Sequence, residues 1–245
     1  MRSKSLKLFD MDHTIEQSAN AEYPLLIFVL LQAVFMFTAV FILSSSTQWP
    51  QSLSSPSAEL MQLIRDHPGE VRLGYLCYLI STVFFIPIAM LLHSVLDIAK
   101  NPTLRIATFL GLAGVIFKIL GILRWLTIQP FLAGLNSDAT HMESVTLLFK
   151  VTNMYLGTVG EVLGVMLCMG TWTVLVGTQL RSRYQGMKYL AFLSTLLGTV
   201  TALGSVRLLG ISLPGWFLTV TGAGFQVWII IISIQIYRHR KAINL

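Results

Sequence analysis

Charged residues are scarce in this chain, and their scarcity excludes a soluble globular protein. Asp, Glu, Lys and Arg make up only 11% of its 245 residues, while 54% are hydrophobic. In soluble domains about a quarter of the residues are charged. The mean hydropathy of +0.71 leads to the same conclusion. We therefore predict an all-α polytopic membrane bundle in which residues 1–245 form a single transmembrane domain, because the spans leave no segment able to bury an aqueous core.

Cysteine and histidine are also few, and the usual site motifs are missing. The two cysteines, Cys77 and Cys168, fall in apolar runs near opposite membrane ends, so we expect no disulfide. Of the five histidines only His93 falls in an apolar run, which argues against a bis-histidine haem site. No HExxH, CxxC, EF-hand or P-loop pattern occurs, and no motif singles out a nucleophile. The sequence therefore predicts no metal site and leaves the cofactor open.

Apolar runs long enough to cross a bilayer, which takes about 20 helical residues, occur six times. The second run contains Pro87, which is more typical of a kink than of a break in a membrane helix. The first run begins only after four acidic residues, unlike a cleavable signal peptide, so we interpret it as a retained helix. The predicted spans are residues 24–43, 73–98, 104–125, 148–178, 189–207 and 214–237.

The basic residues favour one orientation of these spans. If both termini are cytoplasmic, 11 of the 17 Lys and Arg residues lie in inner segments, in agreement with the positive-inside rule. This asymmetry predicts a plasma (inner) membrane protein with both termini inside, and the short loops are typical of a bacterial one. Because most basic residues lie in short inner loops and helix ends, the membrane topology explains the net charge of +6. We therefore expect the lipid bilayer as a partner, and no nucleic acid. The inner residues are Arg2, Lys4, Lys7, Lys100, Arg105, Arg181, Arg183, Lys188, Arg238, Arg240 and Lys241.

One segment of the first outer loop, residues 44–70, has the pattern of a short amphipathic helix. Ser55-Pro56 offers an N-cap followed by proline at the first helical position, and His67-Pro68-Gly69 would end the helix. We expect this helix to rest at the membrane interface, or alternatively to cross the mouth of the bundle. Its apolar residues gather on one side: Leu60, Met61, Leu63 and Ile64.

Glu161 is the only charged residue within residues 151–180. A charge inside a span is costly, and by default it marks a functional site or a buried ion pair. With the fourth helix centred in the bilayer, helical rise places Lys118 of the third span at a similar depth. We therefore predict a Lys118–Glu161 ion pair.

Four different helices are each predicted to place a basic residue at the outer rim. Snorkelling to headgroups explains each of them singly. Alternatively, they line a cavity open to the outer side, in which arginines hold an anionic group above Lys118 and Glu161. Tyr75 and Trp125 could form aromatic walls of this cavity, and Gln129 and Asn153 could add hydrogen bonds. The candidate ligand-binding residues are Arg72, Lys118, Arg124, Lys150, Glu161, Arg207, Tyr75 and Trp125.

Several short patterns resemble those of a known family. Arg72-Leu73-Gly74-Tyr75 opens the second span, an arginine lies near the outer end of the third, and Tyr155-Leu156-Gly157 leads into the stretch from Gly160 to Gly164. Together they resemble a widespread bacterial family of small multi-pass membrane proteins catalogued as a domain of unknown function, number 4386. The resemblance implies an integral membrane protein and no assigned activity.

Three functions compete at this point. The first is a non-enzymatic protein that binds or transfers a small anionic or amphipathic ligand at an outer-half cationic pocket. The second is a structural or accessory subunit whose fourth helix receives a partner protein or a second copy, because Gly160 and Gly164 form a small-xxx-small pair. The third is an intramembrane enzyme that uses Glu161 as acid or base. We favour the enzyme least, because no companion catalytic group is evident.

Overall fold

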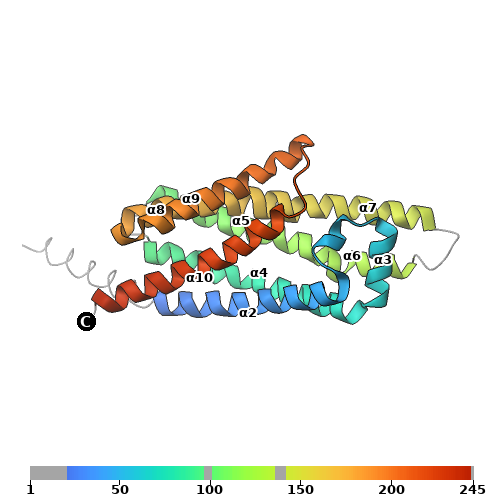
Figure 1. The fold of residues 1–245 in the computed structure, drawn as a ribbon, viewed down its shortest axis with the longest axis horizontal. Helices are drawn as coiled ribbons and strands as arrows, with labels where there is room; N and C mark the ends of the chain where they lie inside the picture. Colours follow the sequence, from blue (N-terminus) through green and yellow to red (C-terminus); the bar gives the residue numbers. More distant parts are fainter. Residues whose placement is uncertain (1–20, 97–100, 136–141, 244–245) are drawn as a thin grey trace, which may run out of the picture.

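The computed structural model of the protein describes residues 21–96, 101–135 and 142–243. Over these residues all regular elements are helical, which confirms the predicted all-α bundle (Figure 1). Six segments are long and apolar enough to cross a bilayer, as predicted. They are Glu22–Thr47, Pro68–Leu96, Pro102–Leu135, Met142–Arg183, Lys188–Leu209 and Phe217–His239.

Several of these segments contain more than one helix. The third joins α5 (Pro102–Leu126) to α6 (Ile128–Leu135), and the fourth joins α7 (Met142–Gly157), the π-helix η2 (Thr158–Met169) and α8 (Gly170–Arg183). The fifth joins α9 (Lys188–Leu203) to the 3₁₀-helix η4 (Gly204–Leu209). The remaining elements are α2 (Glu22–Thr47), η1 (Gln51–Ser54), α3 (Ser57–Asp66), α4 (Pro68–Leu96), η3 (Gln185–Met187) and α10 (Phe217–Ile243).

The third and fourth spans exceed their predicted lengths the most. The fourth contains 42 residues, which at a rise of 1.5 Å gives about 60 Å, twice the ~30 Å of the hydrocarbon core. The third contains 34 residues because α6 continues the chain to Leu135, where the sequence predicted an end at residue 125. Pro130 stands in the first turn of α6, where its missing N–H interrupts no helical hydrogen bond. The bundle therefore projects beyond the hydrocarbon.

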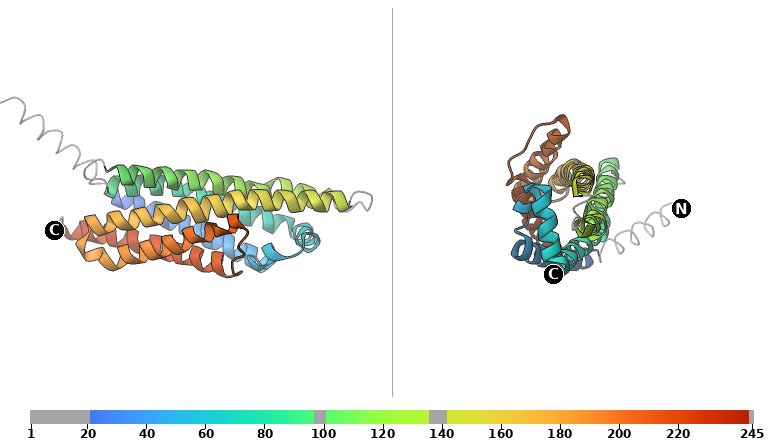
Figure 2. Two further views of the ribbon diagram at one scale, coloured as in Figure 1. Left: turned by 90° about the horizontal axis from the view of Figure 1, so that it is seen from above. Right: turned by 90° about the vertical axis from the view of Figure 1, so that its right-hand side faces the viewer.

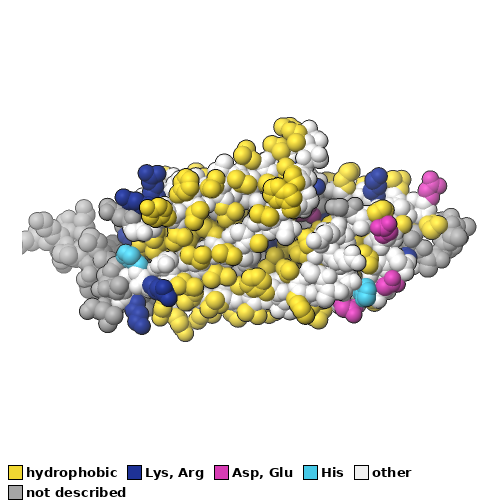
Figure 3. All heavy atoms as spheres, viewed as in Figure 1, with side chains coloured by type: hydrophobic (Ala, Val, Ile, Leu, Met, Phe, Trp, Pro, Cys, Tyr) yellow, Lys and Arg dark blue, Asp and Glu magenta, His cyan; other side chains and the backbone are white. Residues whose placement is uncertain are grey.

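The two ends of the bundle differ in charge. The start of α2 and the end of α10 lie at one end, as an even number of spans requires (Figure 1), and α3 lies at the opposite end (Figure 2). On one face of the molecule, hydrophobic side chains cover the stretch between the charged ends (Figure 3). We call the first end the basic end and the α3 end the distal end. The exposed basic residues of the basic end are Arg105, Arg181, Arg183, Lys188, Arg238 and Lys241.

The predicted amphipathic helix is present as α3, and it covers the distal end. Met61 and Ile64 are buried in one hydrophobic cluster with Phe149 of α7. Arg65 Nη1 also donates a hydrogen bond of 3.1 Å to the carbonyl oxygen of Ala133 in α6. The helix therefore packs on α6 and α7 as a cap, in agreement with the alternative that it crosses the mouth of the bundle.

An aromatic cluster fills the basic half of the bundle. The rings of Trp172 and Phe85 meet edge to face with centroids 4.9 Å apart, and Trp228 lies 5.8 Å from Trp172. Phe225 packs against all three rings. Trp228 Nε1 donates a hydrogen bond of 2.6 Å to Ser194 Oγ, so its indole is satisfied. Rings from α4, α8 and α10 thus close the interior on this side.

Candidate functional site

Three charged side chains from three spans meet at Glu161. Arg124 in the last turn of α5 donates from Nη2 to Glu161 Oε1 over 3.3 Å. Arg207 in η4 donates from Nη1 to Glu161 Oε2 over the same distance, 3.3 Å. One carboxylate therefore bridges two guanidinium groups, and the ionised set keeps a net positive charge. We call these three residues the Arg–Glu–Arg triad.

Helical rise places the triad about one hydrocarbon thickness from the basic end. Each member stands 19 or 20 residues from a basic residue of the basic end, namely Arg105, Arg181 or Lys188. This separation corresponds to about 30 Å of helix, the thickness of the hydrocarbon core. The side chains of Glu161 and Arg207 are partly exposed, at 30% and 40%.

Arg124 is the buried member of the triad. Its side chain is only 5% exposed, and its Nε and Nη1 atoms have no hydrogen-bond partner among the described residues. Gly157 provides the space for the guanidinium, because a Cβ atom there would lie 2.8 Å from Nη1. An unsatisfied buried donor costs about 1–3 kcal/mol, and more when it is charged. Two of the three nitrogen atoms of this buried guanidinium are thus left without a hydrogen-bond partner among the described residues.

A close helix crossing fixes the place of the triad. A Cβ atom on Gly121 of α5 would lie 2.7 Å from the Cα of Gly160 in η2, and one on Gly164 would lie 3.0 Å from an α5 backbone nitrogen. Small residues permit such approach between membrane helices. Because Arg124 is one turn from Gly121 and Glu161 follows Gly160, the crossing brings the two charges together. The glycine face that we hypothesised for a partner helix is therefore occupied within the chain.

The π-helix changes the register of the fourth span. π-helices are rare, usually last a single turn and are frequent at functional sites, whereas η2 contains 12 residues. Residues beyond Gly157 therefore leave the α-helical wheel on which Lys150 and Glu161 share a face. Lys150 and Met154 are exposed, whereas Gly157 is buried. The continuous polar stripe expected from the wheel is not formed.

The predicted Lys118–Glu161 ion pair was wrong. Lys118 lies about 9 Å nearer the basic end than Arg124 along α5, and Glu161 pairs with the two arginines instead. Lys118 Nζ lies 4.6 Å from the ring centroid of Tyr78, a cation–π contact. The prediction centred the fourth helix in the bilayer, but its excess length projects at the distal end only. Glu161 consequently reaches the level of Arg124.

The predicted aromatic wall lies beside Arg124. The rings of Tyr75 and Trp125 stack with centroids 4.9 Å apart and planes 1° apart, and both belong to the buried cluster that includes α3. Gln129 is fully buried and donates to Thr152 Oγ1 over 3.4 Å. Its Oε1 has no partner among the described residues. The distal side of the triad is thus closed by packed aromatic and polar side chains.

The other two candidates lie outside the site. Arg72 and Lys150 are exposed, and neither forms an ion pair or hydrogen bond with a residue in the described part of the chain. Tyr78, which contacts Lys118, was not among the candidates, although it follows Tyr75 by one turn on the same helix. The structure therefore groups Arg124, Glu161 and Arg207, with Lys118 and the aromatic rings around them.

Fold and site together define a multi-pass α-helical membrane protein with a charged site in one half of the bundle. The chain belongs to the family described as a domain of unknown function (DUF4386), whose model matches residues 27–235. This match confirms the resemblance seen in the sequence. No curated protein and no solved structure matches the chain.

Proposed function

We propose that this protein binds, and on binding can transfer, a small anionic or amphipathic ligand at the Arg–Glu–Arg triad. The observation that carries the proposal is the buried guanidinium of Arg124, whose Nε and Nη1 atoms lack partners among the described residues. A guanidinium presents several donors in a planar fork that suits phosphate and carboxylate groups. Glu161 holds and orients the two arginines, and the remaining positive charge favours an anion.

The aromatic cluster supports binding rather than conduction. Phe85, Trp172 and Trp228 are buried at 3%, 1% and 5% exposure and pack across the basic half of the bundle. An ion or solute at the triad would meet this packed interior before it reached the basic end. The proposed site is therefore a binding site in the distal half, and passage through the bundle would require these rings to move.

The orientation belongs to the same proposal. Both termini are cytoplasmic, and the distal end faces outward from a bacterial plasma (inner) membrane. The support is the ring of exposed basic residues at the basic end, since Lys and Arg concentrate on the cytoplasmic side. A reporter enzyme that is active only in the cytoplasm, fused after Leu245, tests this: activity is expected, and inactivity of a well-expressed fusion would overturn it.

The binding proposal is tested with a matched pair of arginine variants. Purified protein in neutral detergent is titrated with inorganic phosphate and with a short-chain phosphatidylglycerol, and bound anion is counted by native mass spectrometry. Arg124→Gln removes the buried charge and the guanidinium fork, and the exposed Arg72→Gln removes the same charge elsewhere. We expect binding of at least one probe to weaken about tenfold in Arg124→Gln, as for a lost interaction worth about 1.4 kcal/mol, and to persist in Arg72→Gln.

The result that overturns the proposal is equal binding of both probes by wild type and Arg124→Gln, or no binding by wild type. Folding of each variant is checked through its two cysteines, which are free and buried. A fluorogenic thiol reagent reacts with them only when the bundle opens, so the melting curve separates lost binding from lost structure.

A further inference from the structure

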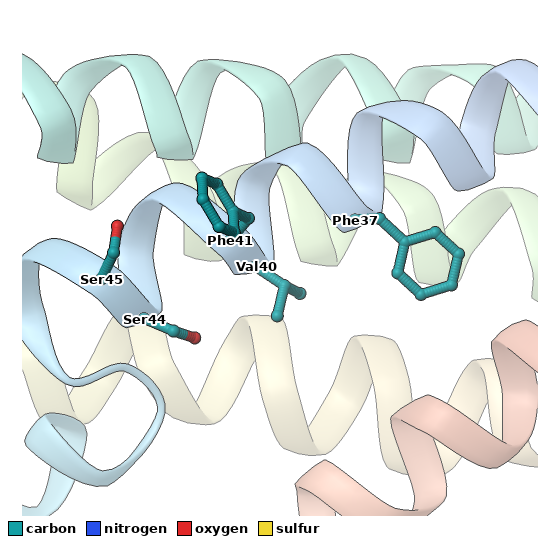
Figure 4. Close-up of a pocket in the computed structure, with 5 residues that line it drawn as sticks. All are labelled: Phe37, Val40, Phe41, Ser44 and Ser45. Atoms are coloured by element: carbon teal, nitrogen blue, oxygen red, sulfur yellow. The ribbon is translucent and has the colours of Figure 1, made fainter.

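A groove lies on the distal half of α2. It has a volume of about 510 Å³ and is lined by Phe37, Val40, Phe41, Ser44 and Ser45. Figure 4 shows Phe37, Val40 and Ser44 projecting from α2 toward the side on which α10 lies. The groove is shallow and open, and all five lining residues belong to α2. The lining is apolar apart from the two serine hydroxyl groups at its distal end.

Helices α2 and α10 are adjacent near the basic end and diverge toward the distal end (Figure 1). Seen from above, α2 and α10 overlap (Figure 2). The two helices therefore separate within the plane of Figure 1. Phe217, the first residue of α10, packs on Val162 and Met166 of η2. The helix therefore begins just on the basic side of Glu161 and does not extend alongside the triad.

The groove and the triad lie at the same depth. Val40 and Ser44 stand 18 and 22 residues from the start of α2 at Glu22, which corresponds to roughly 27 and 33 Å of helix. Contacts between the helices relate this level to the triad: a Cβ atom on Gly74 of α4 would lie 2.6 Å from Leu43, which precedes Ser44, and the neighbouring Tyr75 stacks on Trp125 beside Arg124. The apolar part of the groove is thus at the level of acyl chains, and its serines are at the level of the headgroups.

The aqueous route to the triad is covered at the distal end. There α3 caps the bundle, and the stacked rings of Tyr75 and Trp125 lie between this cap and Arg124. The side chains of Glu161 and Arg207 nevertheless remain 30% and 40% exposed, which leaves the side of the bundle as the route to the triad. A ligand that reaches Arg124 from this side passes through lipid.

We infer that the ligand is an amphipathic anion that enters sideways from the bilayer between α2 and α10. This inference rests on the proposed function and names its ligand class. The phosphate or carboxylate headgroup binds to Arg124 and Arg207, and an acyl chain lies along the groove at Phe37 and Val40. The charge of the triad, its depth and the apolar groove beside α10 are the three features that such a molecule matches.

Two tryptophan substitutions on α2 test the inference. Val40→Trp fills the groove, whereas Val34→Trp adds the same side chain at a position on α2 that is 61% exposed and outside the groove. Each variant is reconstituted in phosphatidylcholine nanodiscs with graded phosphatidylglycerol, and retained phosphatidylglycerol is counted after extraction. Binding of inorganic phosphate is measured in parallel. We expect Val40→Trp to weaken phosphatidylglycerol binding about tenfold and to leave phosphate binding unchanged, with Val34→Trp like wild type.

The outcomes separate this inference from the proposed function. If Arg124→Gln weakens binding but Val40→Trp and Val34→Trp both bind phosphatidylglycerol like wild type, the lateral entry is overturned and the anion site stands. The same holds if wild type binds phosphate but not phosphatidylglycerol. If Arg124→Gln binds both probes like wild type, the proposed function fails, and the inference fails with it. A failure of Val40→Trp to fold is recognised in the thiol assay, and Val40→Phe then takes its place.

Discussion

Neutralising Glu161 should destabilise the protein, because this carboxylate is the ion-pair partner of two guanidinium groups. At 3.3 Å and an effective dielectric constant of about 20, each pair interacts with a gross energy of roughly 5 kcal/mol, most of it offset by desolvation and by repulsion between the arginines. Removing one partner of a buried pair costs about 3–5 kcal/mol. Glu161 is 30% exposed, so we expect Glu161→Gln to cost about 3 kcal/mol, at the lower end of that range.

The second half of this prediction is an asymmetry between the two partners. Arg124→Met removes the two unpartnered buried nitrogens together with the charge, and Glu161 keeps Arg207. Arg124→Met should therefore cost less than Glu161→Gln. In the double variant Arg124→Met/Glu161→Gln no charge is left buried without a partner, so its stability should exceed that of Glu161→Gln alone. The expected coupling is about 1–3 kcal/mol, as for residues in direct contact.

Unfolding is followed through Cys77 and Cys168, the only cysteines of the chain, which are 7% and 6% exposed. A thiol-reactive fluorogenic dye reports the temperature and the denaturant concentration at which these thiols become accessible. Arg72→Met, at an exposed position, is the matched control and should change stability by less than about 0.5 kcal/mol. Additive effects of the two single variants, or a Glu161→Gln variant as stable as the control, would refute the bridging role of Glu161.

Three further predictions concern the surroundings of the triad. Gly121→Ala places a Cβ 2.7 Å from the Cα of Gly160 and should cost about 1–3 kcal/mol in the thiol assay. Gly222→Ala, with no atom within 4 Å of the new Cβ, should be neutral or stabilising by up to about 1 kcal/mol; equal melting of the two would contradict the crossing. Trp172→Ala should cost about 3–5 kcal/mol while native mass spectrometry shows unchanged anion binding, and a loss of binding would tie the aromatic cluster to the site. Lys118→Gln should weaken binding less than Arg124→Gln, since Lys118 faces Tyr78, and a larger effect would place the anion deeper than proposed.

The helices and their number could be predicted because hydropathy and turn residues act locally. Ser55-Pro56 and His67-Pro68 predicted a helix, and α3 runs from Ser57 to Asp66 between them. The lengths of the third and fourth spans could not be predicted in the same way. Four apolar residues of α6 and α7 pack under α3, namely Leu132, Ala133, Val145 and Phe149, and hydropathy alone does not separate such burial in protein from burial in lipid.

The members of the triad were all candidates, but their pairing was wrong for a physical reason. Helical rise gives depth along one helix, whereas the axial offset between two helices depends on how their surfaces interlock. Here Gly121 and Gly160 set that offset through backbone contact. An error of six residues along α5 amounts to about 9 Å, which is the difference between Lys118 and Arg124. The π-helix added a second error, since an α-helical wheel no longer applies beyond Gly157.

The unsatisfied guanidinium of Arg124 distinguishes a binding role from a structural one. If the triad served stability alone, a methionine at position 124 and a neutral residue at position 161 would fill the same space and leave no buried donor without a partner. Replacing a buried ion pair by such residues is often neutral or stabilising. A ligand that binds only the folded state, by contrast, stabilises it by about 2.7 kcal/mol at a concentration 100 times its Kd. Phosphatidylglycerol should therefore raise the melting temperature of the wild type but not that of Arg124→Met. If both proteins respond alike, the lipid acts elsewhere and Arg124 is a structural residue.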